Sequence, residues 1–342
     1  LHRRHVDLRV VVFYRGPLER ELIEAGVPLT ILEKRGRWDV AGFLPQLART
    51  LRELRPAVVL SYPGSPNVAS AMLRSIHRGR IAWRVQPSGF GSSVANRSLE
   101  RSLARFAAVL IAGSQTEREM AAVEGYPASR LIVIPNGVDT EHFRRDEGGR
   151  FTTRNAWRIP EGAPLIGRVG RLEPHKDYPS FLQAAAIVAR ARPDVRFVCI
   201  GGGTANQMNE LRRLGEQLGL GERIIWTGAI TMQASTFSAL DLLVSSSSSG
   251  EGVPMVVAEA MACGVPVAAT DVGDSAWTVG DERFIVPPSN PGALAEAMLA
   301  LLRDIDDRLI DQGALRARIE RDLSIDRMLD RTQSALFGSG DR

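Results

Sequence analysis

The chain has 342 residues, of which 44% are hydrophobic and 24% charged, so it is long enough for two domains and too apolar for intrinsic disorder. The longest apolar run, residues 253–270, contains Glu259 and two prolines, which excludes a membrane-spanning helix. Two cysteines, Cys199 and Cys263, are too few for a disulfide framework, so we expect them in the core of a cytoplasmic protein.

The net charge of +4 is distributed unevenly along the chain. Residues 1–150 carry 23 basic and 15 acidic side chains, and the basic segment 40–115 carries ten arginines against two glutamates. Such an excess suits an anionic partner, such as a phosphate group or a lipid surface. Nucleic acid is not expected as a partner, because no aromatic platform for stacking bases accompanies the arginines.

In the first half of the chain, short β-rich apolar runs alternate with helical patterns. Strands are predicted at residues 8–14, 27–32, 57–62, 81–85, 109–112 and 131–134. Helices are predicted at residues 18–25, 43–54, 98–106 and 115–124. A polar stretch at residues 144–150 follows the turn Pro135-Asn136-Gly137 and is interpreted as an interdomain linker.

The helix predicted at residues 43–54 has two interpretations. Apolar residues at helical spacing stand beside three arginines, namely Phe43, Leu44, Leu47, Leu51 and Leu54 with Arg49, Arg52 and Arg55. The helix could lie on an anionic leaflet, at the inner face of the cytoplasmic membrane. It could equally be an ordinary helix whose apolar face packs into the core and whose arginines are solvated.

The second half repeats the alternation and then becomes wholly helical. Strands are predicted at residues 165–170, 195–201, 224–227, 242–246, 265–270 and 284–286. Helices are predicted at residues 178–191, 207–218, 235–240, 254–262, 292–303 and 308–337. Alternation of this kind predicts parallel sheets covered on both faces, with ligands at the carboxyl ends of the strands. We expect domains at residues 1–142 and 143–305, followed by terminal helices at 306–342.

Two cations follow the strand predicted at residues 165–170. The strand ends in Gly170, Arg171 comes next, and Lys176 follows five residues later as one of only two lysines in the chain. Glycine lets the backbone approach a ligand closely, and two cations at the carboxyl end of a strand suit a diphosphate. The competing interpretation of Arg171 alone is a solvated loop charge.

A serine-rich loop, residues 245–254, leads from the strand predicted at 242–246 into a helix. Pro254 suits the first helical position, so free amides and the positive end of the helix would form an anion site. Glu251 precedes this helix, and Glu259 within it is the only charge between residues 253 and 270. We expect Glu259 to bind sugar or ribose hydroxyls, the alternative being an internal ion pair with an arginine.

A third loop, Gly201-Gly202-Gly203-Thr204-Ala205-Asn206, only partly matches a dinucleotide fingerprint, because Asn206 stands where the third glycine belongs. We interpret it as a tight turn. The sequence has no Asp-x-Asp pair at a strand end, no Walker A loop, no Gly-x-Ser-x-Gly elbow and no Cys/His cluster with metal spacing. We therefore expect no metal and no organic cofactor.

Taken together, these segments resemble family 4 of the retaining glycosyltransferases (glycosyl transferases group 1), which have the α/β GT-B fold of two facing Rossmann-like domains with parallel sheets. The resemblance is dense over residues 133–300. It is carried by Ile134-Pro135-Asn136-Gly137-Val138-Asp139, by Gly170-Arg171 with Lys176-Asp177, by Glu251 with Glu259, by Glu259-Ala260-Met261-Ala262-Cys263-Gly264-Val265-Pro266, and by Thr270-Asp271-Val272-Gly273-Asp274.

The resemblance implies a metal-independent, retaining hexosyltransferase that moves a sugar from a nucleotide diphosphate sugar to the hydroxyl of a glycan or lipid-linked acceptor. Arg171 and Lys176 would bind the diphosphate and neutralise the leaving group, and Glu251 would orient the sugar. The other donor-binding residues would be Gly170, Gly252, Val253, Pro254, Met255 and Glu259. The helices at residues 306–342 would pack back on the first domain.

The N-terminal half departs from the family pattern in two places. We expect it to lack the first strand and glycine-rich loop, and its loop Gln86-Pro87-Ser88-Gly89 has no histidine where many members place one. Two alternatives stay open, the first of them because of these departures. The chain could be a non-catalytic nucleotide-sugar-binding protein, or another GT-B enzyme such as a sugar-nucleotide epimerase.

Overall fold

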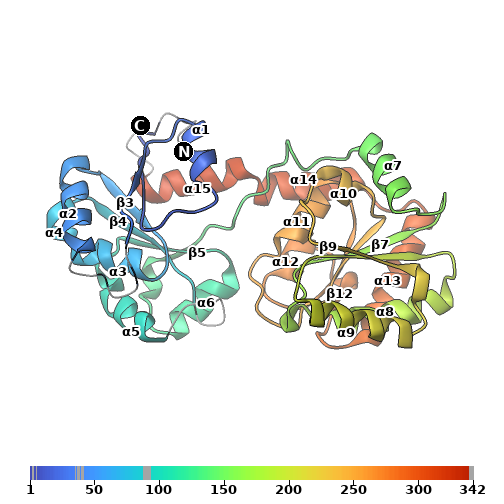
Figure 1. Cartoon of the computed structure of the whole chain (residues 1–342). Coiled ribbons are helices and arrows are strands. Elements are labelled where there is room, and N and C mark those ends of the chain that lie inside the picture. The colour runs from blue at the N-terminus through green and yellow to red at the C-terminus, as the bar shows by residue number, and fades with distance from the viewer. Residues whose placement is uncertain are drawn as a thin grey trace. The chain divides into compact units, whose positions relative to one another are not determined.

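The computed structural model describes residues 1, 4, 6–34, 36, 39, 42–87 and 94–338, the side chains of 94–97 excepted, and it divides into two compact units (Figure 1). The first unit comprises Leu1–Ala112, Arg118–Ile134 and Leu329–Arg342. The second comprises Gly113–Glu117 and Pro135–Met328. Each unit contains parallel strands connected by helices, so the prediction of two Rossmann-like α/β domains is confirmed.

The strands of the first unit form two parallel sheets. Strand β1 (Val10–Val12) pairs with β2 (Leu29–Ile31), and a four-stranded sheet has the order β3 (Val58–Ser61), β4 (Arg80–Arg84), β5 (Val109–Ala112), β6 (Leu131–Val133). The helices are α1 (Glu19–Glu24), α2 (Phe43–Leu54), α3 (Ser65–Met72), α4 (Arg74–His77), α5 (Val94–Leu103) and α6 (Gln115–Val123). Helices α3 and α4 are not among the predicted elements. For α3 the reason is that residues 64–70 are rich in Gly, Pro, Asn and Ser, which are poor helix formers, and α4 is a single turn of four residues. Ser88 and Gly89, named above, lie outside the described residues.

Helix α2 packs its apolar face into the protein. Phe43, Leu47 and Leu51 are buried in one core cluster, and its arginines are exposed. These apolar side chains are therefore unavailable to a lipid leaflet, and the core-facing interpretation of this helix is the correct one.

The second unit is built on a six-stranded parallel sheet in the order β12-β11-β10-β7-β8-β9. Its strands are β7 (Leu165–Val169), β8 (Arg196–Ile200), β9 (Ile224–Gly228), β10 (Leu242–Ser245), β11 (Val267–Thr270) and β12 (Ile285–Val286). The chain runs from β7 outward through β8 to β9, then returns to place β10 on the other side of β7. The strand order therefore reverses between β7 and β10, which is where open α/β sheets bind their ligands.

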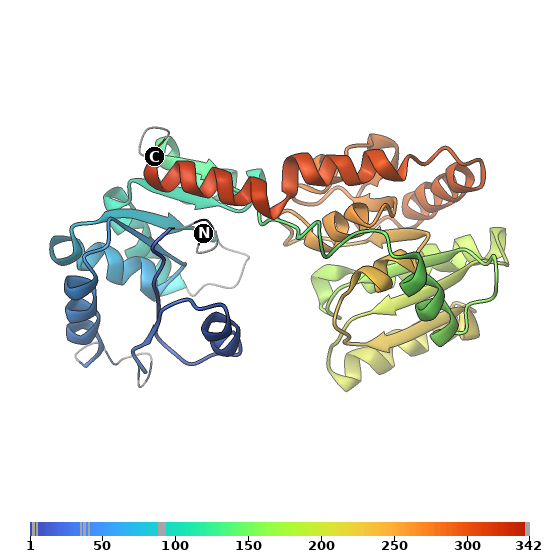
Figure 2. The same cartoon turned by 90° about the horizontal axis from the view of Figure 1, so that it is seen from above.

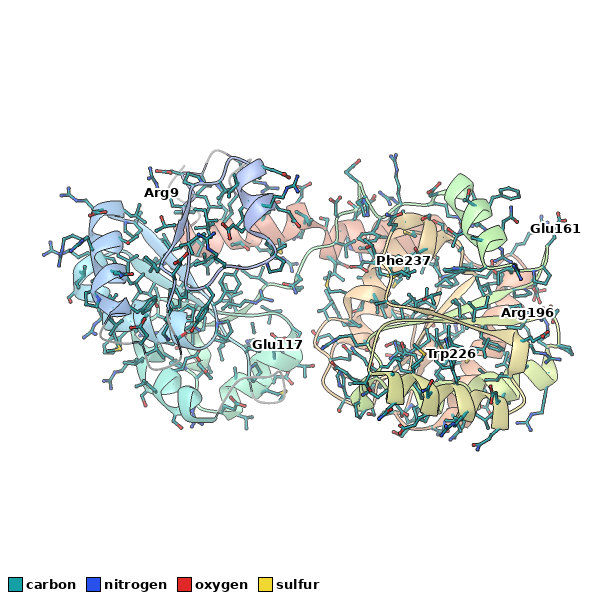
Figure 3. The ribbon with its side chains drawn as sticks, viewed as in Figure 1. Arg9, Glu117, Glu161, Arg196, Trp226 and Phe237 are labelled. Carbon is teal, nitrogen blue, oxygen red and sulfur yellow. The ribbon has the colours of Figure 1, made fainter. Side chains whose placement is uncertain are left out.

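Helices cover both faces of this sheet (Figure 1). One core cluster joins the sheet to α8 (Tyr178–Ala191), α9 (Ala205–Gln217) and α13 (Pro291–Asp306). The other joins it to α10 (Ala234–Ser238), α11 (Met255–Ala262), α12 (Ser275–Val279) and α14 (Gln312–Leu323). Phe237 of α10, labelled in Figure 3, is fully buried in the second cluster. Cys199 and Cys263 are buried free thiols, as expected.

The predicted linker at residues 144–150 is wrong, because most of it belongs to helix α7 (Glu147–Ala156). The Asp146 carboxylate accepts a hydrogen bond from the Gly149 amide and so caps the helix. Arg150 and Arg154 of α7 both form ion pairs with Asp241, which precedes β10. Helix α7 is thereby attached to the second unit.

The last two helices begin in the second unit. Helix α14 packs against α11, and Figure 2 shows it lying across the face of the second unit that α11 covers. Helix α15 (Ile325–Phe337) follows, and its residues from Leu329 onward belong to the first unit. The second unit therefore extends to Met328, beyond the expected boundary at residue 305. Within the described ranges, none of the helices combines the length and apolarity that crossing a bilayer requires.

Candidate functional site

The candidate site lies within the second unit, at the carboxyl ends of β7 and β10. These strands are paired neighbours, with Arg168 opposite Val244 in the register. The loop after β7 carries Gly170, Arg171 and Lys176, and the loop after β10 carries Glu251. The fold therefore brings together, at the reversal of the strand order, the two loops that the sequence singled out.

The backbone at Gly170 requires glycine. Its φ of 154° belongs to a region that other residues rarely adopt, and its carbonyl accepts a hydrogen bond of 2.5 Å from the Tyr178 hydroxyl. Gly201 packs against it so closely that a Cβ there would lie 1.8 Å from the Gly170 oxygen. The loop Gly201-Gly202-Gly203, which only partly matches a dinucleotide fingerprint, thus packs against the loop that follows β7.

Lys176 and Glu251 form the centre of the site. The Lys176 ammonium lies 2.5 Å from Oε1 of Glu251, and the Ser247 hydroxyl donates to the same oxygen at 2.6 Å. Both charged side chains are largely buried, with 18% and 11% of their surfaces exposed. Oε2 of Glu251 accepts no hydrogen bond from the described residues. One carboxylate oxygen is therefore available to a ligand.

Hydrogen bonds join the two loops along their length. The amide of Ser248 donates to the His175 carbonyl at 2.8 Å, and the Ser246 hydroxyl lies 3.0 Å from the Lys176 carbonyl. From the neighbouring strand β11, the Thr270 hydroxyl donates to the Ser247 carbonyl at 2.6 Å. The site is therefore held in place before any ligand binds.

Arg168 is a functional candidate that the sequence analysis did not select. It lies in β7 with 1% of its surface exposed, and its guanidinium donates to the carbonyls of Val169 and Lys176. Its Nε also donates to the Ser246 hydroxyl at 3.0 Å. An arginine in a run predicted to be a buried strand is the only signal of it in the sequence.

Arg171 lies apart from this network. Its side chain is 73% exposed and forms an ion pair with Glu173 of the same loop. It therefore contributes a solvated cation at the edge of the site.

The segment Gly252-Val253-Pro254 leads into α11, with Pro254 as its N-cap and Met255 as its first residue, so the helix begins one residue later than predicted. No side chain of the described residues caps this end, so the amides of Met255 and Val256 are open to an anion, whereas the Val257 amide donates to the Pro254 carbonyl. Further along, burial raises the pKa of the Glu259 carboxyl to about 7. No arginine in the described part of the chain pairs with Glu259, so the alternative of an internal ion pair has no support.

The side chains of the site are cations, hydroxyl groups and the two carboxyl groups of Glu251 and Glu259. Among the described residues there is no group of three or more His, Cys, Asp or Glu side chains that could hold a metal ion. Together the side chains offer two cations, helix amides and two carboxylates with free acceptor capacity, the groups that suit a diphosphate attached to hydroxyl-bearing sugars.

Two Rossmann-like units with this strand order define the GT-B class of glycosyltransferase folds. Two family models match the chain, glycosyltransferase family 4 over residues 1–142 and glycosyl transferases group 1 over residues 163–304. The chain therefore belongs to the family 4 (group 1) glycosyltransferases.

Curated relatives carry glycosyltransferase names. A GDP-mannose-dependent alpha-(1-6)-phosphatidylinositol monomannoside mannosyltransferase of Mycobacterium tuberculosis is 29% identical over 72% of this chain and 64% of its own length. A D-inositol 3-phosphate glycosyltransferase of Corynebacterium urealyticum is 34% identical over 62% of this chain and 53% of its own length. The chain thus spans less than two thirds of the length of these relatives.

Solved structures share the whole fold. Anabaena HepE in complex with UDP has a TM-score of 0.85 at 21% identity, covering 96% of this chain and 91% of that one. A glycosyltransferase from Rickettsia africae has a TM-score of 0.84 at 17% identity, covering 95% of this chain and 88% of that one. These likenesses confirm the GT-B fold.

Proposed function

We propose that the protein is a glycosyltransferase that moves a hexosyl group from a nucleotide diphosphate sugar to an acceptor hydroxyl, with retention at the anomeric carbon. The observation that carries the proposal is the Lys176–Glu251 pair, which places a cation and a carboxylate with one free oxygen at the carboxyl ends of β7 and β10. Membership of the glycosyltransferase family and the names of the relatives support it.

The diphosphate of the donor would bind between Lys176 and the start of α11. The backbone at Gly170 leaves room for it, and the amides of Gly252, Val253 and Met255 precede or begin the helix (Pro254 has no N–H). Lys176 supplies a largely buried cation, and Arg171 adds an exposed one at the edge. Glu259 would accept hydrogen bonds from the ribose hydroxyls, and Oε2 of Glu251 from the sugar.

Catalysis would come from stabilising the leaving group. When the bond between the anomeric carbon and the diphosphate oxygen breaks, negative charge grows on the diphosphate and positive charge on the sugar ring. Lys176 and Arg171 would neutralise the first charge electrostatically. The acceptor hydroxyl attacks on the face that the diphosphate leaves, and its proton passes to a phosphate oxygen. This sequence needs no enzymic nucleophile and gives retention.

The same cations would do the work that a metal ion does in Asp-x-Asp enzymes, so the reaction would proceed without metal and without an organic cofactor. Turnover should therefore be unchanged by a chelator such as EDTA. A loss of turnover in EDTA that added Mg²⁺ or Mn²⁺ restores would refute metal independence.

The acceptor would be a glycan or a lipid-linked molecule at the inner face of the cytoplasmic membrane. Exposed arginines on the neighbouring helices α2 and α4 and at their C-caps support an electrostatic contact with anionic lipid, namely Arg49, Arg52, Arg55, Arg74 and Arg78. Co-sedimentation with anionic vesicles at low salt, lost at high salt and absent with neutral vesicles, is the expected result. Equal binding to both vesicle types, or binding to neither, would refute the contact.

The reaction is tested with a panel of UDP- and GDP-sugars, by measuring release of the nucleoside diphosphate with and without acceptor. Release that requires acceptor and is coupled to a new glycosidic bond supports the proposal. Binding without release would favour a non-catalytic nucleotide-sugar-binding protein. Formation of an epimeric nucleotide sugar would favour an epimerase.

A further inference from the structure

Arg168 is a cation buried inside the second unit. It belongs to β7, where only 1% of its surface is exposed, and its guanidinium carbon lies 4.9 Å from the centre of the Tyr178 ring. Burying a charged group is unfavourable unless something compensates for the lost hydration. The hydrogen-bond partners of Arg168 therefore show whether the protein itself compensates for this buried charge.

The partners of Arg168 are all neutral oxygens. Its guanidinium donates to the Val169 carbonyl at 2.5 Å, to the Lys176 carbonyl at 2.7 Å and to the Ser246 hydroxyl at 3.0 Å. Among the residues that the structure describes, it forms no ion pair. Glu251, the carboxylate of the adjoining loop, binds Lys176 and Ser247 instead. The positive charge of Arg168 is thus without a counter-ion in the described part of the chain.

This charge lies beside the backbone at Gly170, in the loop that follows β7. A Cβ built on Gly170 would lie 3.2 Å from Nη1 of Arg168 and 3.8 Å from Cδ of Lys176. The guanidinium therefore approaches the space at Gly170 from inside the protein, while the stem of Lys176 borders the same space. Because Gly170 has no side chain, this residue places no atom between Arg168 and a group that would bind in this space.

We infer that Arg168 is a positioning residue with a second role, in which its unneutralised buried charge attracts the diphosphate of the donor. The inference rests on the proposed function, because it takes the diphosphate to bind at Gly170 and Lys176. A diphosphate would supply the counter-charge that no described residue provides, and in a buried setting this attraction is weakly screened. The bond to the Lys176 carbonyl additionally fixes the backbone that carries the Lys176 ammonium.

A purely structural role would consist of the three hydrogen bonds alone. The variants Arg168→Met and Arg168→Lys separate the two roles, because both lose the planar fork but only lysine keeps the charge. Arg316→Met is the matched control. Arg316 likewise donates to three oxygens, the backbone carbonyls of Thr140, Phe143 and Ala262, and none of them belongs to the loops after β7 and β10.

The experiment titrates the intact protein with UDP, GDP, inorganic pyrophosphate and the two nucleosides, and records thermal unfolding of each variant without ligand. We expect Arg168→Met to weaken binding of the nucleoside diphosphate and of pyrophosphate by about tenfold or more, with no change for the nucleoside. Arg168→Lys should recover a substantial part of that loss. Arg316→Met should lower the unfolding temperature and leave the preference for diphosphate over nucleoside unchanged.

Two results overturn the inference. One is an Arg168→Lys variant as weak as Arg168→Met, which would leave only the hydrogen bonds. The other is unchanged pyrophosphate and nucleoside diphosphate binding in a folded Arg168→Met variant. A wild type that binds neither UDP nor GDP would instead contradict the proposed function, and the role of Arg168 with it.

Discussion

Lys176 and Glu251 are 75 residues apart in the sequence, yet their Nζ and Oε1 atoms lie 2.5 Å apart. Each follows a different strand of the second unit, and the reversal of strand order between β7 and β10 makes those strands neighbours. The pair has two consequences. The ammonium is held in place in the absence of a ligand, and under the proposed function the diphosphate of the donor would share it with Glu251.

The first prediction concerns Lys176. Lys176→Ala removes the buried cation that would stabilise the departing diphosphate, so we expect turnover to fall by about two orders of magnitude or more, measured as acceptor-dependent release of nucleoside diphosphate. Lys34 is the only other lysine of the chain and lies in the first unit against the Phe43 ring, so Lys34→Ala is the control. Near-normal turnover of a folded Lys176→Ala variant would disprove the role of Lys176.

A second prediction concerns Gly273, which has a φ of 61° and packs against the Glu251 loop. A Cβ at Gly273 would lie 2.3 Å from the Glu251 carbonyl oxygen and 2.7 Å from that of Gly252, so the loop must move. We expect Gly273→Ala to weaken nucleoside diphosphate binding by about tenfold, because a shift on the order of 1 Å is enough to misplace a binding group.

The matched control is Gly219→Ala. Gly219 has a φ of 76°, but a Cβ there would meet no atom within 4 Å. This variant therefore carries only the backbone strain, and we expect it to lose stability while binding nucleoside diphosphate normally. Equal binding losses in the two variants would mean that backbone strain, and not the contact with Glu251, causes the effect.

The strands of the fold could be predicted from the sequence because runs of β-branched and apolar residues are local signals. Helix α7 could not, since two of its first three residues, Gly148 and Gly149, have weak helix propensity. What stabilises this helix is non-local. Arg150 and Arg154 bind Asp241, which is 91 and 87 residues further along the chain.

In the candidate site, too, the contacts between residues far apart in the sequence could not be predicted. Lys176, Glu251 and Glu259 stand out in the sequence because each is a charged residue in an unusual setting. Arg168 gives only the weaker signal of an arginine in a predicted buried strand, and a strand pattern does not say where a long side chain finds its partners. The three oxygens that bind it come from its own strand and from two loops, and only the folded sheet brings them together.

The third prediction concerns Asp241, whose carboxylate binds Arg150, Arg154 and the Leu165 amide. Asp241→Asn keeps the shape but removes the charge, and leaves two largely buried guanidinium groups without their counter-ion. We expect the free energy of unfolding to fall by about 2–3 kcal/mol, measured by denaturant titration. Asp194→Asn is the control, because Asp194 is about half exposed where it pairs with Arg192, and its loss should cost less than about 1 kcal/mol. Similar losses in the two variants would show that Asp241 does not hold α7.

The fourth prediction concerns the pH dependence of Glu259. Burial raises the pKa of this carboxyl to about 7 from the ordinary value of 4.5, so the folded state keeps a proton that the unfolded chain releases between these pH values. The resulting stabilisation is fully present below about pH 4.5 and is lost as the pH rises through about 7. Glu259→Gln stays neutral throughout.

In the absence of ligand, Glu259→Gln should therefore gain stability over the wild type as the pH rises from 5 to 8, by on the order of 2 kcal/mol once partial exposure is allowed for. Thermal unfolding at the two pH values measures this gain. Ligand binding should show the opposite preference, because the ionised carboxylate is the better acceptor for ribose hydroxyls. The wild type should bind nucleoside diphosphate more tightly at pH 8 than at pH 6, and Glu259→Gln should bind weakly at both. Parallel stability curves for the two proteins would refute the raised pKa, and equal binding would refute the contact with ribose.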